Sequence, residues 1–244
     1  MFSPHGPTLR ELAVQALSSV ERGYDLLAPK FDHTPFRTPD TVLDAVEGTL
    51  AALGPFDHGL DLCCGTGAGM DVLRTVCRES VTGLDFSTGM LAVAREQIRS
   101  DGPPRVGWVR GDARALPFGS AFDLVVSFGA FGHFLPGELP CLFTQVHSVL
   151  RPGGRFAFPV VAPPRPSSPW YWALLGFDAT MRVRNALWRP PFVMYYRAFR
   201  FGDVRRELVR AGFTVEHHAL PDFGHRPDGS PRCRLIVARR VTAG

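Results

Sequence analysis

The stretch GLDLCCGTGAG, residues 59–69, combines an acid, two adjacent cysteines and four glycines. A cysteine metal or redox site does not fit, because adjacent cysteines lack the spacing of a zinc site and no second CxxC or HxH pair accompanies them. A strand that ends in a glycine-rich turn and opens a helix suits a nucleotide instead. Glycines let the backbone approach a ligand closely, and the N–H groups of a helix N-terminus face it. The same string also occurs in dehydrogenases and in plain turns, so the surrounding residues decide between these readings.

Three aspartates surround this turn in the expected fold. Asp61 lies on the strand ahead of the glycines, Asp85 ends the next predicted strand, and Asp112 follows the third. The carboxyl ends of parallel strands share one edge of the sheet, where open α/β proteins bind ligands. At that edge Asp85 can accept hydrogen bonds from both hydroxyls of a ribose, and Asp112 can accept one from an adenine amino group. Their joint spacing favours a nucleotide-containing ligand over three unrelated loop caps.

Apolar runs and helical patterns alternate from residue 59 to residue 161, which predicts a parallel sheet covered on both faces. The strands are expected at 59–64, 80–86, 105–112, 122–129 and 153–161, and the helices at 69–78, 87–99, with Ser87 as its cap, and 137–150. After a helix at 203–213, two strands at 213–220 and 232–240 follow without an intervening helix, which predicts an antiparallel pair. Ahead of the alternation we expect one helix at 8–20 and another that Thr38 caps and that Gly54-Pro55 ends.

Composition limits the class of protein. The chain has 244 residues, 45% of them hydrophobic and 20% charged, which suits one large α/β domain. No apolar run reaches the ~18 residues of a membrane span, no secretory signal is visible, and five cysteines are an odd number at irregular spacing. We therefore expect a cytoplasmic protein. The net charge of +4 keeps RNA as an alternative partner, although Lys30 is the only lysine and the arginines are scattered.

Residues 163–200 interrupt the alternation. They begin with a linker-like PPRPSSP and contain three of the four tryptophans. We interpret the segment as a lid or substrate-binding insertion. The alternatives are an additional helical layer or a dimer contact that buries the aromatic residues.

At this point the chain resembles a known family. LDLCCGTGAG, VTGLDFSTGML, GDARALPFGSAFDLVVSFGAFGHF and LRPGGRFAF, in that order, resemble the class I S-adenosylmethionine-dependent methyltransferases, and above all their small-molecule branch. LVRAGF and RCRLIVARR resemble the closing hairpin of that family. The resemblance implies one α/β domain over residues 1–244, a Rossmann-like three-layer sandwich. Its mostly parallel seven-stranded sheet would end in an antiparallel strand, with an N-terminal helical cap at 1–40 and the lid at 163–200.

The resemblance also implies a set of positions that bind S-adenosylmethionine. They are Tyr24, Asp61, Gly65, Thr66, Gly67, Asp85, Phe86, Met90, Asp112, Ala113, Ser127 and Phe128. Within this set the turn glycines would lie under the methionine part of the cofactor, and Asp85 would hold the ribose. Phe86 and Met90 would enclose the adenine, whose edge Asp112 and the backbone of Ala113 would read. The segment 127–128 would lie beside the methionine amine and the sulfonium, and Tyr24 would cover the cofactor.

Two positions depart from the family pattern. Cys63 stands where many members have the first glycine of the turn, which puts the backbone path there in question. Phe31 stands where a tyrosine is frequent, so a hydroxyl contact is missing.

Methyl transfer from a sulfonium is a direct displacement, so the protein mainly supplies alignment and a dry site. His133, just after the fourth strand, is the best placed general base if the nucleophile must lose a proton. The alternative is a neutral histidine that packs against the cofactor pocket. Weaker base candidates are Tyr24, His33, Tyr195 and Tyr196. We expect no metal, and we expect Cys141, which follows a proline inside a helical pattern, to be a core residue.

The function predicted from these observations is methylation of a small, lipophilic or aromatic metabolite, without a metal ion. The aromatic residues between 170 and 199 motivate the substrate class. Alternatives are an RNA methyltransferase, an NAD(P)-dependent Rossmann oxidoreductase, or a cofactor-binding domain without catalysis. The LRPGG element and the terminal hairpin argue against the oxidoreductase. The expected partner is a small molecule rather than a nucleic acid, and the expected state is a monomer or a homodimer.

Overall fold

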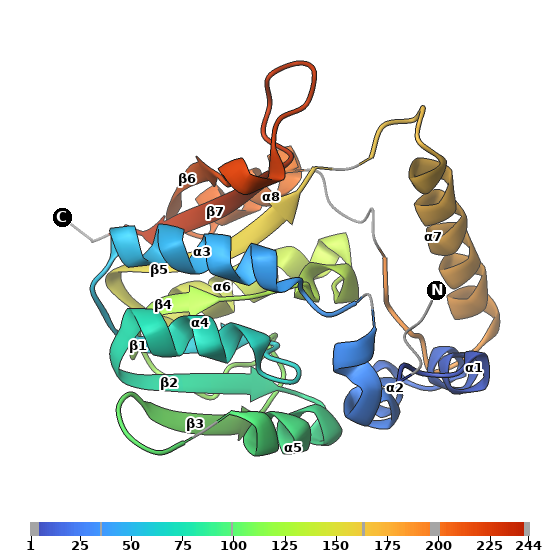
Figure 1. Ribbon diagram of the computed structural model, residues 1–244, viewed down its shortest axis with the longest axis horizontal. Coiled ribbons are helices and arrows are strands. Elements are labelled where there is room, and N and C mark those ends of the chain that lie inside the picture. The colour runs from blue at the N-terminus through green and yellow to red at the C-terminus, as the bar shows by residue number, and fades with distance from the viewer. Residues whose placement is uncertain (1–4, 35, 99, 163, 196–200, 242–244) are drawn as a thin grey trace.

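In the computed structural model of the chain, strands and helices alternate as the sequence predicts (Figure 1). The structure describes residues 5–34, 36–98, 100–162, 164–195 and 201–241. The helices are α1 (Leu9–Leu17), α2 (Val20–Leu27), α3 (Asp40–Leu53), α4 (Ala68–Val76), α5 (Thr88–Gln97), α6 (Leu139–Val149), α7 (Pro169–Leu187) and α8 (Phe201–Arg210). The strands are β1 (Phe56–Leu62), β2 (Cys77–Asp85), β3 (Arg105–Arg110), β4 (Phe122–Val126), β5 (Leu150–Val161), β6 (Phe213–Ala219) and β7 (Cys233–Arg240). Short 3-10 helices are η1 (Ala28–His33), η2 (Ala130–His133), η3 (Pro136–Glu138) and η4 (Pro221–Phe223).

Within these described residues the strands form one seven-stranded sheet in the order β3-β2-β1-β4-β5-β7-β6. The first five strands of that order pair in parallel, and β7 pairs antiparallel with both β5 and β6. The predicted α/β fold, with a mostly parallel sheet and an antiparallel closing strand, is confirmed. The chain order reverses between β1 and β4, so the carboxyl ends of these neighbours form the crevice in which such sheets bind ligands.

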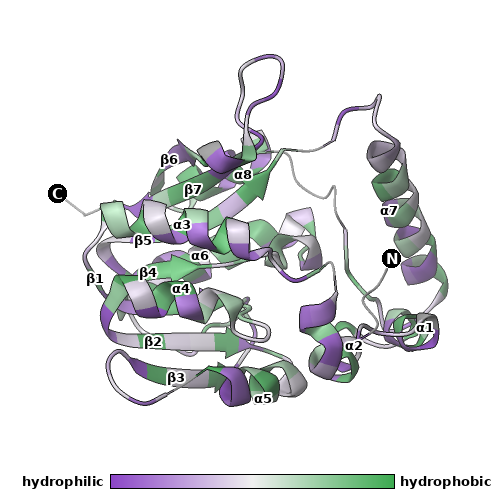
Figure 2. Ribbon diagram, in the orientation of Figure 1, coloured by the Kyte–Doolittle hydropathy of each residue, from purple (hydrophilic) through white to green (hydrophobic). Residues whose placement is uncertain are grey.

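The central strands are buried on both faces, as their continuous apolar runs predict. On β4, Val125 belongs to the core shared with α6 and α8, whereas Leu124 and Val126 belong to the core shared with α3 and α4. Successive side chains of a strand point to opposite faces, so one short strand contributes to both cores. Figure 2 shows β4, at the centre of the sheet, as mostly hydrophobic. The result is a three-layer sandwich whose rigid sheet edge positions the site.

The N-terminal part differs in detail from the prediction. The expected helix 8–20 ends at Leu17, and a new helix begins at Val20, capped by Ser19, whose side chain accepts a hydrogen bond from the N–H of Arg22. Residues 20–33, which contain many turn-forming residues, are also helical. The two helices are separate because both Ser18 and Ser19 adopt extended backbone angles, which break the helical path at this pair.

The predicted cap of the helix near residue 40 is wrong by one position. Pro39, with extended backbone angles, occupies the N-cap position of α3, and no side chain caps this helix. Thr38 therefore lies one residue too early for its hydroxyl to reach the first N–H groups of the helix. The predicted stop at Gly54 and the cap of α5 by Ser87, which accepts a hydrogen bond from the N–H of Met90, are both confirmed.

Two aspartates fasten the N-terminal helices over the edge of the sheet. Asp25 accepts hydrogen bonds from the hydroxyl of Ser87 and the N–H of Gly89, at 2.6 and 2.8 Å. Asp32 accepts one from the hydroxyl of Thr66 at 2.7 Å. These contacts join α2 and η1 to the turn after β1 and to the start of α5, so the helices α1 and α2 cover one end of the sheet (Figure 1).

Candidate functional site

The glycine turn after β1 consists of residues in an unusual backbone conformation. Cys63 (φ 60°), Gly65 (φ 53°) and Gly67 (φ 96°) all lie in the left-handed region. For a residue with a side chain this conformation costs roughly 1–2 kcal/mol, so Cys63 keeps the backbone path that a glycine would take at some cost in stability. The N–H of Cys64 donates to the carbonyl of Leu84 at 3.0 Å, which ties the turn to β2.

The cysteines of the turn are not reactive thiols. Burial, followed by the charge of Asp85 for Cys63 and of Asp61 for Cys64, raises both thiol pKa values well above their usual range. A thiol that keeps its proton is neither a nucleophile nor a metal ligand. Cys141, which was expected in the core, is exposed instead, and its thiol lies 3.4 Å from the carbonyl oxygen of Arg114. Across the described residues, no group of three or more His, Cys, Asp or Glu is placed to hold a metal ion.

Asp85, at the end of β2, shapes the turn. It is buried, and its two oxygens accept hydrogen bonds from the N–H of Gly65 and of Ser87, each at 2.9 Å. Burial raises its pKa, and these N–H groups partly oppose that rise. A carboxylate offers about four acceptor positions, so further donors can still bind.

Asp61, on β1, is the most unusual group of the site. Its side chain is 1% exposed, and neither carboxylate oxygen has a hydrogen-bond partner among the described residues. Burial, and secondly the charge of Asp85, raises its pKa to about 8. Gly69 makes room for it, because a Cβ there would lie 2.5 Å from Oδ2 of Asp61 and 2.6 Å from the ring of Phe128. A buried carboxylate without donors is costly unless a ligand supplies them.

Asp112, after β3, is paired with Arg114, a residue that the sequence did not reveal as part of the site. The guanidinium of Arg114 donates to both its oxygens, at 2.9 and 2.7 Å, and to Glu138 at 2.6 Å. The hydrogen bond from Arg114 lowers the pKa of Asp112, which is half-exposed. The arginine therefore holds the carboxylate ionised and oriented at the rim of the site.

Tyr24 and His133 form a hydrogen-bonded pair. The hydroxyl of Tyr24 lies 2.7 Å from Nε2 of His133, and Nδ1 of His133 lies 2.8 Å from the carbonyl oxygen of Val193. A carbonyl can only accept, so Nδ1 carries the proton and Nε2 accepts the hydrogen bond from Tyr24. Burial lowers the pKa of His133, which keeps the imidazole neutral at neutral pH.

One cleft of about 670 Å³ brings most of the predicted residues together at the carboxyl ends of β1, β2, β3 and β4. The predicted residues that line it are Tyr24, Asp61, Gly65, Thr66, Asp85, Phe86, Met90, Asp112, Ala113, Phe128 and His133. Gly67 and Ser127 do not line it. Gly67 forms the N-cap of α4, and the buried hydroxyl of Ser127 donates to the carbonyl of Leu62 at 2.9 Å, which joins β4 to β1.

The remaining base candidates lie apart from this pair or outside the description. His33 is exposed at the end of η1 and does not line the cleft. Tyr195 lines the cleft, but its hydroxyl accepts a hydrogen bond from Asn185 at 3.0 Å. Tyr196 lies outside the described residues.

The sequence reasoning missed several residues that line the cleft. Arg37 and Arg114 bring cations to it, Glu138 an acid, and Val193 the carbonyl that fixes the tautomer of His133. No local motif marks them. Only Arg37 lies next to a feature that the sequence does show, the helix start at residues 38–40.

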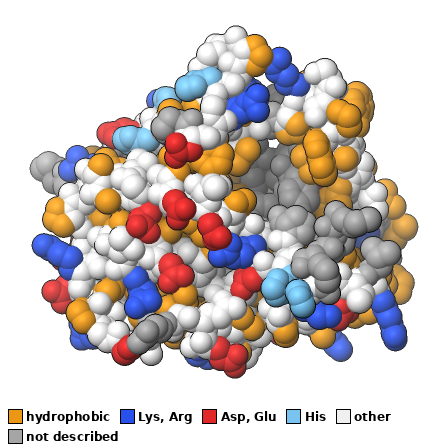
Figure 3. Space-filling view, viewed as in Figure 1, with side chains coloured by type: hydrophobic (Ala, Val, Ile, Leu, Met, Phe, Trp, Pro, Cys, Tyr) orange, Lys and Arg blue, Asp and Glu red, His pale blue; other side chains and the backbone are white. Residues whose placement is uncertain are grey.

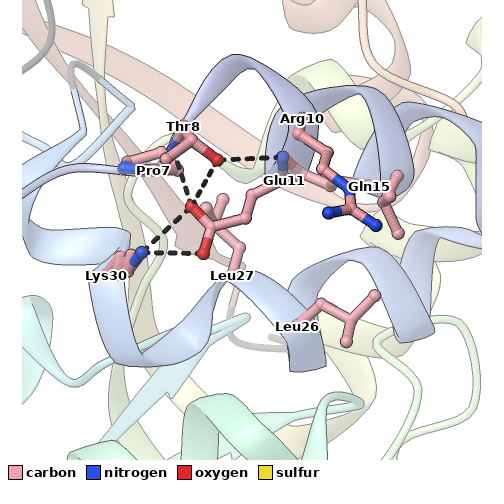
Figure 4. Close-up of a pocket in the computed structure, with 9 residues that line it drawn as sticks. Pro7, Thr8, Arg10, Glu11, Gln15, Leu26, Leu27 and Lys30 are labelled. Carbon is pink, nitrogen blue, oxygen red and sulfur yellow. Dashed lines mark hydrogen bonds and ion pairs between the residues drawn. The ribbon is translucent and has the colours of Figure 1, made fainter.

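A second cavity, of about 390 Å³, lies between α1 and α2 (Figure 4). Its acid is already paired: Glu11 accepts hydrogen bonds from Thr8 and from Lys30, whose Nζ lies 2.7 Å away. These bonds lower the pKa of Glu11 to about 2. The pairing joins α1 to η1, which is a structural role for Glu11.

The cleft residues fit S-adenosylmethionine. Asp61 lacks donors and matches a ligand that brings an ammonium, which the methionine end of the cofactor carries. The remaining acceptor positions of Asp85 suit ribose hydroxyls, and the apolar side chains of Phe86 and Met90 suit the faces of an adenine. The volume of the cleft lies within the range of small-molecule sites and leaves space for a second molecule.

Comparisons with known proteins agree with this geometry. Residues 60–154 match the family described as a methyltransferase domain. An uncharacterized methyltransferase of Synechocystis is 34% identical over 165 residues, which cover 67% of this chain and 70% of that protein. Demethylmenaquinone methyltransferase of Lactiplantibacillus plantarum is 32% identical over 230 residues, 87% of this chain and 95% of that one.

Another relative matches a shorter segment. The 2-phytyl-1,4-naphtoquinone methyltransferase of Thermosynechococcus vestitus is 39% identical over 103 residues, which are 43% of its length. Two solved structures share the fold. Magnesium protoporphyrin IX methyltransferase of Synechocystis, with bound S-adenosylhomocysteine, has a TM-score of 0.57 at 20% identity and covers 82% of this chain and 81% of its own. An S-adenosylmethionine-dependent methyltransferase of Mesorhizobium loti has a TM-score of 0.56 at 26% identity over 81% of this chain and 100% of its own.

Proposed function

The chain belongs to the class I S-adenosylmethionine-dependent methyltransferases, and on that premise we propose that it methylates a lipophilic phenol or hydroquinone. The observation that carries this proposal is the Tyr24–His133 pair, which borders a cleft whose other walls are largely aromatic and aliphatic. The relatives named for naphthoquinone and menaquinone precursors support the same class of ring.

In this proposal the carboxyl ends of the strands bind the cofactor. Asp61 accepts hydrogen bonds from the methionine ammonium, and Asp85 accepts them from the ribose hydroxyls. Asp112 and the backbone of Ala113 read the edge of the adenine, and Arg114 holds Asp112 in place for that contact. When bound, S-adenosylmethionine supplies an electrophilic methyl group on its sulfonium.

We assign the other walls of the cleft to the acceptor. They come from the N-terminal helices, from η2 and from the segment after α7, and their apolar members are Val20, Phe31, Phe36, Phe134, Leu135, Pro191, Val193 and Met194. Asn185 of α7 fixes the segment after it, because its side chain hydrogen-bonds both the N–H and the carbonyl of Phe192, at 2.8 and 3.0 Å. The described part of 163–200 thus acts as a lid over an apolar lobe, and residues 1–40 act as the opposite cap of a single domain.

The Tyr24–His133 pair acts on the hydroxyl proton of the acceptor. The oxygen of Tyr24 takes that proton while its own moves to Nε2 of His133, and Nδ1–H keeps its bond to Val193. As this proton leaves, the acceptor becomes a better nucleophile at its oxygen and at the ring carbons beside it. The negative charge that develops on the acceptor oxygen and the positive charge that develops on the imidazole of His133 stay within one chain of hydrogen bonds.

The pKa values decide when this proton moves. A phenol titrates at about 10, whereas burial lowers the pKa of His133 from 6.5. Full transfer before methylation is therefore unfavourable. The proton moves together with methyl transfer, which is general base catalysis rather than prior ionisation.

The direct test is methyl transfer from S-adenosylmethionine with a deuterated methyl group to a prenylated 1,4-naphthohydroquinone. The matched control is the same compound with both hydroxyls blocked as ethers, and total RNA is the competing acceptor. We expect a product heavier by one labelled methyl group from the hydroquinone and none from the blocked compound. Labelling of RNA alone, or of the blocked compound as fast as the hydroquinone, contradicts the proposal.

A further inference from the structure

The outward face of α7 is apolar, which is the reverse of an ordinary surface helix. Trp172, Leu175, Val183 and Leu187 are 61%, 39%, 59% and 80% exposed. With Ala179, which is also exposed, they follow one another at intervals of three or four residues. That spacing places them on one side of the helix, where solvent-facing residues are normally polar.

The side of α7 that faces the protein packs in a small core. That core accounts for only some of the apolar residues of the helix. Met181 is buried in a small core with Phe192, Met194 and Tyr195, and Phe177 packs against it. The core therefore needs one apolar side of this helix. On the second apolar side, the indole N–H of Trp172 donates to the carbonyl of Pro166 at 2.9 Å and its ring lies against Tyr171, yet Trp172 and Leu187 remain 61% and 80% exposed.

The exposed charged side chains of residues 164–195, the segment that carries this face, are arginines. Arg165, Arg182 and Arg189 are exposed, and the only acid between residues 164 and 195 is Asp178, which is buried. Trp170 and Trp188, at the two ends of α7, are 71% and 53% exposed. Tryptophan and arginine together at the ends of an apolar stripe are typical of helices that lie in the interface of a membrane.

The apolar surface continues from α7 to the N-terminal helices. The guanidinium of Arg184 donates to the carbonyl of Ser18 at 3.0 Å, which joins α7 to the end of α1. Beside this joint, Val14, Leu17 and Leu26 are about half exposed. Figure 1 shows α1 and α7 on the same side of the molecule, and Figure 3 shows hydrophobic side chains gathered along the edge that α7 occupies.

We propose that this surface, the outward side of α7 with the exposed side chains of α1 and α2, docks on a lipid bilayer that contains anionic headgroups. Charge decides between a bilayer and a second copy of the chain. In a symmetric dimer two copies of an arginine-bearing face without exposed acids on α7 would face each other, whereas anionic headgroups complement these arginines. None of the described helices is long and apolar enough to cross a membrane, so the contact is with the interface.

The test is co-sedimentation of the full chain with sucrose-loaded vesicles of phosphatidylcholine, with and without phosphatidylglycerol as about one third of the lipid. The variant Trp172→Glu/Leu187→Glu places charge on the outward face of α7. The matched control is Val209→Glu, an equally exposed apolar residue on α8 that is 50% exposed. Circular dichroism and affinity for S-adenosylhomocysteine check that each variant is folded.

We expect the wild type and Val209→Glu to sediment with anionic vesicles, and salt to weaken the binding. The double variant should bind at least about tenfold more weakly, because it carries acids into the headgroup region. Each arginine replaced by glutamine should cost about fivefold. No binding of the wild type, or equal binding of the double variant, overturns the proposal. A wild-type dimer that the double variant abolishes also overturns it and assigns the surface to a second copy. Since no acceptor is present, the result is independent of the proposed substrate.

Discussion

Asp61 provides the sharpest quantitative prediction. It is buried without a hydrogen-bond partner in the described part of the chain and its pKa is about 8, so at pH 7 about nine-tenths of the free protein carries a protonated Asp61. A bound ammonium stabilises the ionised form. Binding of S-adenosylhomocysteine, which carries the same methionine end as the cofactor, should therefore release about 0.9 proton at pH 7 and about one at pH 6. The ligand amine is already charged over this range and takes up little.

Calorimetry in two buffers of different ionisation enthalpy measures this proton release directly. In Asp61→Asn the release should disappear, because the amide has no proton to lose. The affinity should fall about 10- to 100-fold, the equivalent of a charge-assisted hydrogen bond of about 1.5–3 kcal/mol. If the wild type releases no proton at pH 6–7, or if Asp61→Asn releases as many, the assignment of Asp61 to the ammonium is wrong.

Three further predictions concern stability. The folded pKa of Asp61 lies above its unfolded value, so the folded chain keeps a proton that the unfolded chain loses between about pH 4 and 8, and stability falls as pH rises. As pH rises over that range, the melting temperature of ligand-free Asp61→Asn should thus increase relative to that of the wild type. A difference in melting temperature that does not change with pH would contradict the predicted direction. Cys63→Gly should be about 1 kcal/mol more stable than Cys63→Ala in urea unfolding, because only glycine relieves the left-handed backbone, and equal stability would show that Cys63 is unstrained. Asp85→Ala should destabilise the ligand-free protein by roughly 2 kcal/mol or more, since it strands the N–H groups of Gly65 and Ser87; an unchanged unfolding midpoint would limit Asp85 to ligand binding.

The sheet was predictable from the sequence because its signals are local. The apolar runs of β1 and β4, the glycines of the turn and the cap at Ser87 each depend on a few neighbouring residues. The convergence of Asp61, Asp85 and Asp112 on one cleft followed from the same logic, since the ends of parallel strands share one edge. Thr38 was misplaced as a cap because one residue of shift changes which group faces the helix end, and propensity does not resolve that shift.

The acceptor side of the cleft was not predictable in the same way. Tyr24 and His133 are 109 residues apart, and Val193 lies a further 60 residues along. Only tertiary packing brings them into one hydrogen-bonded chain. The same holds for Thr66, whose hydroxyl is held by Asp32, and for Arg114, whose link to Glu138 depends on the position of η3.

The central claim is that the chain methylates a hydroxylated ring whose proton the Tyr24–His133 pair removes. Its most direct measurement is kcat of His133→Ala with the prenylated naphthohydroquinone, compared with the wild type across pH. Burial lowers the pKa of His133, so the wild-type rate should fall only below pH 6.5. The account predicts a kcat lower by about 10²- to 10⁴-fold in the variant, loss of that acidic limb, and unchanged affinity for S-adenosylhomocysteine. A variant that keeps the full kcat and the wild-type pH profile would contradict it.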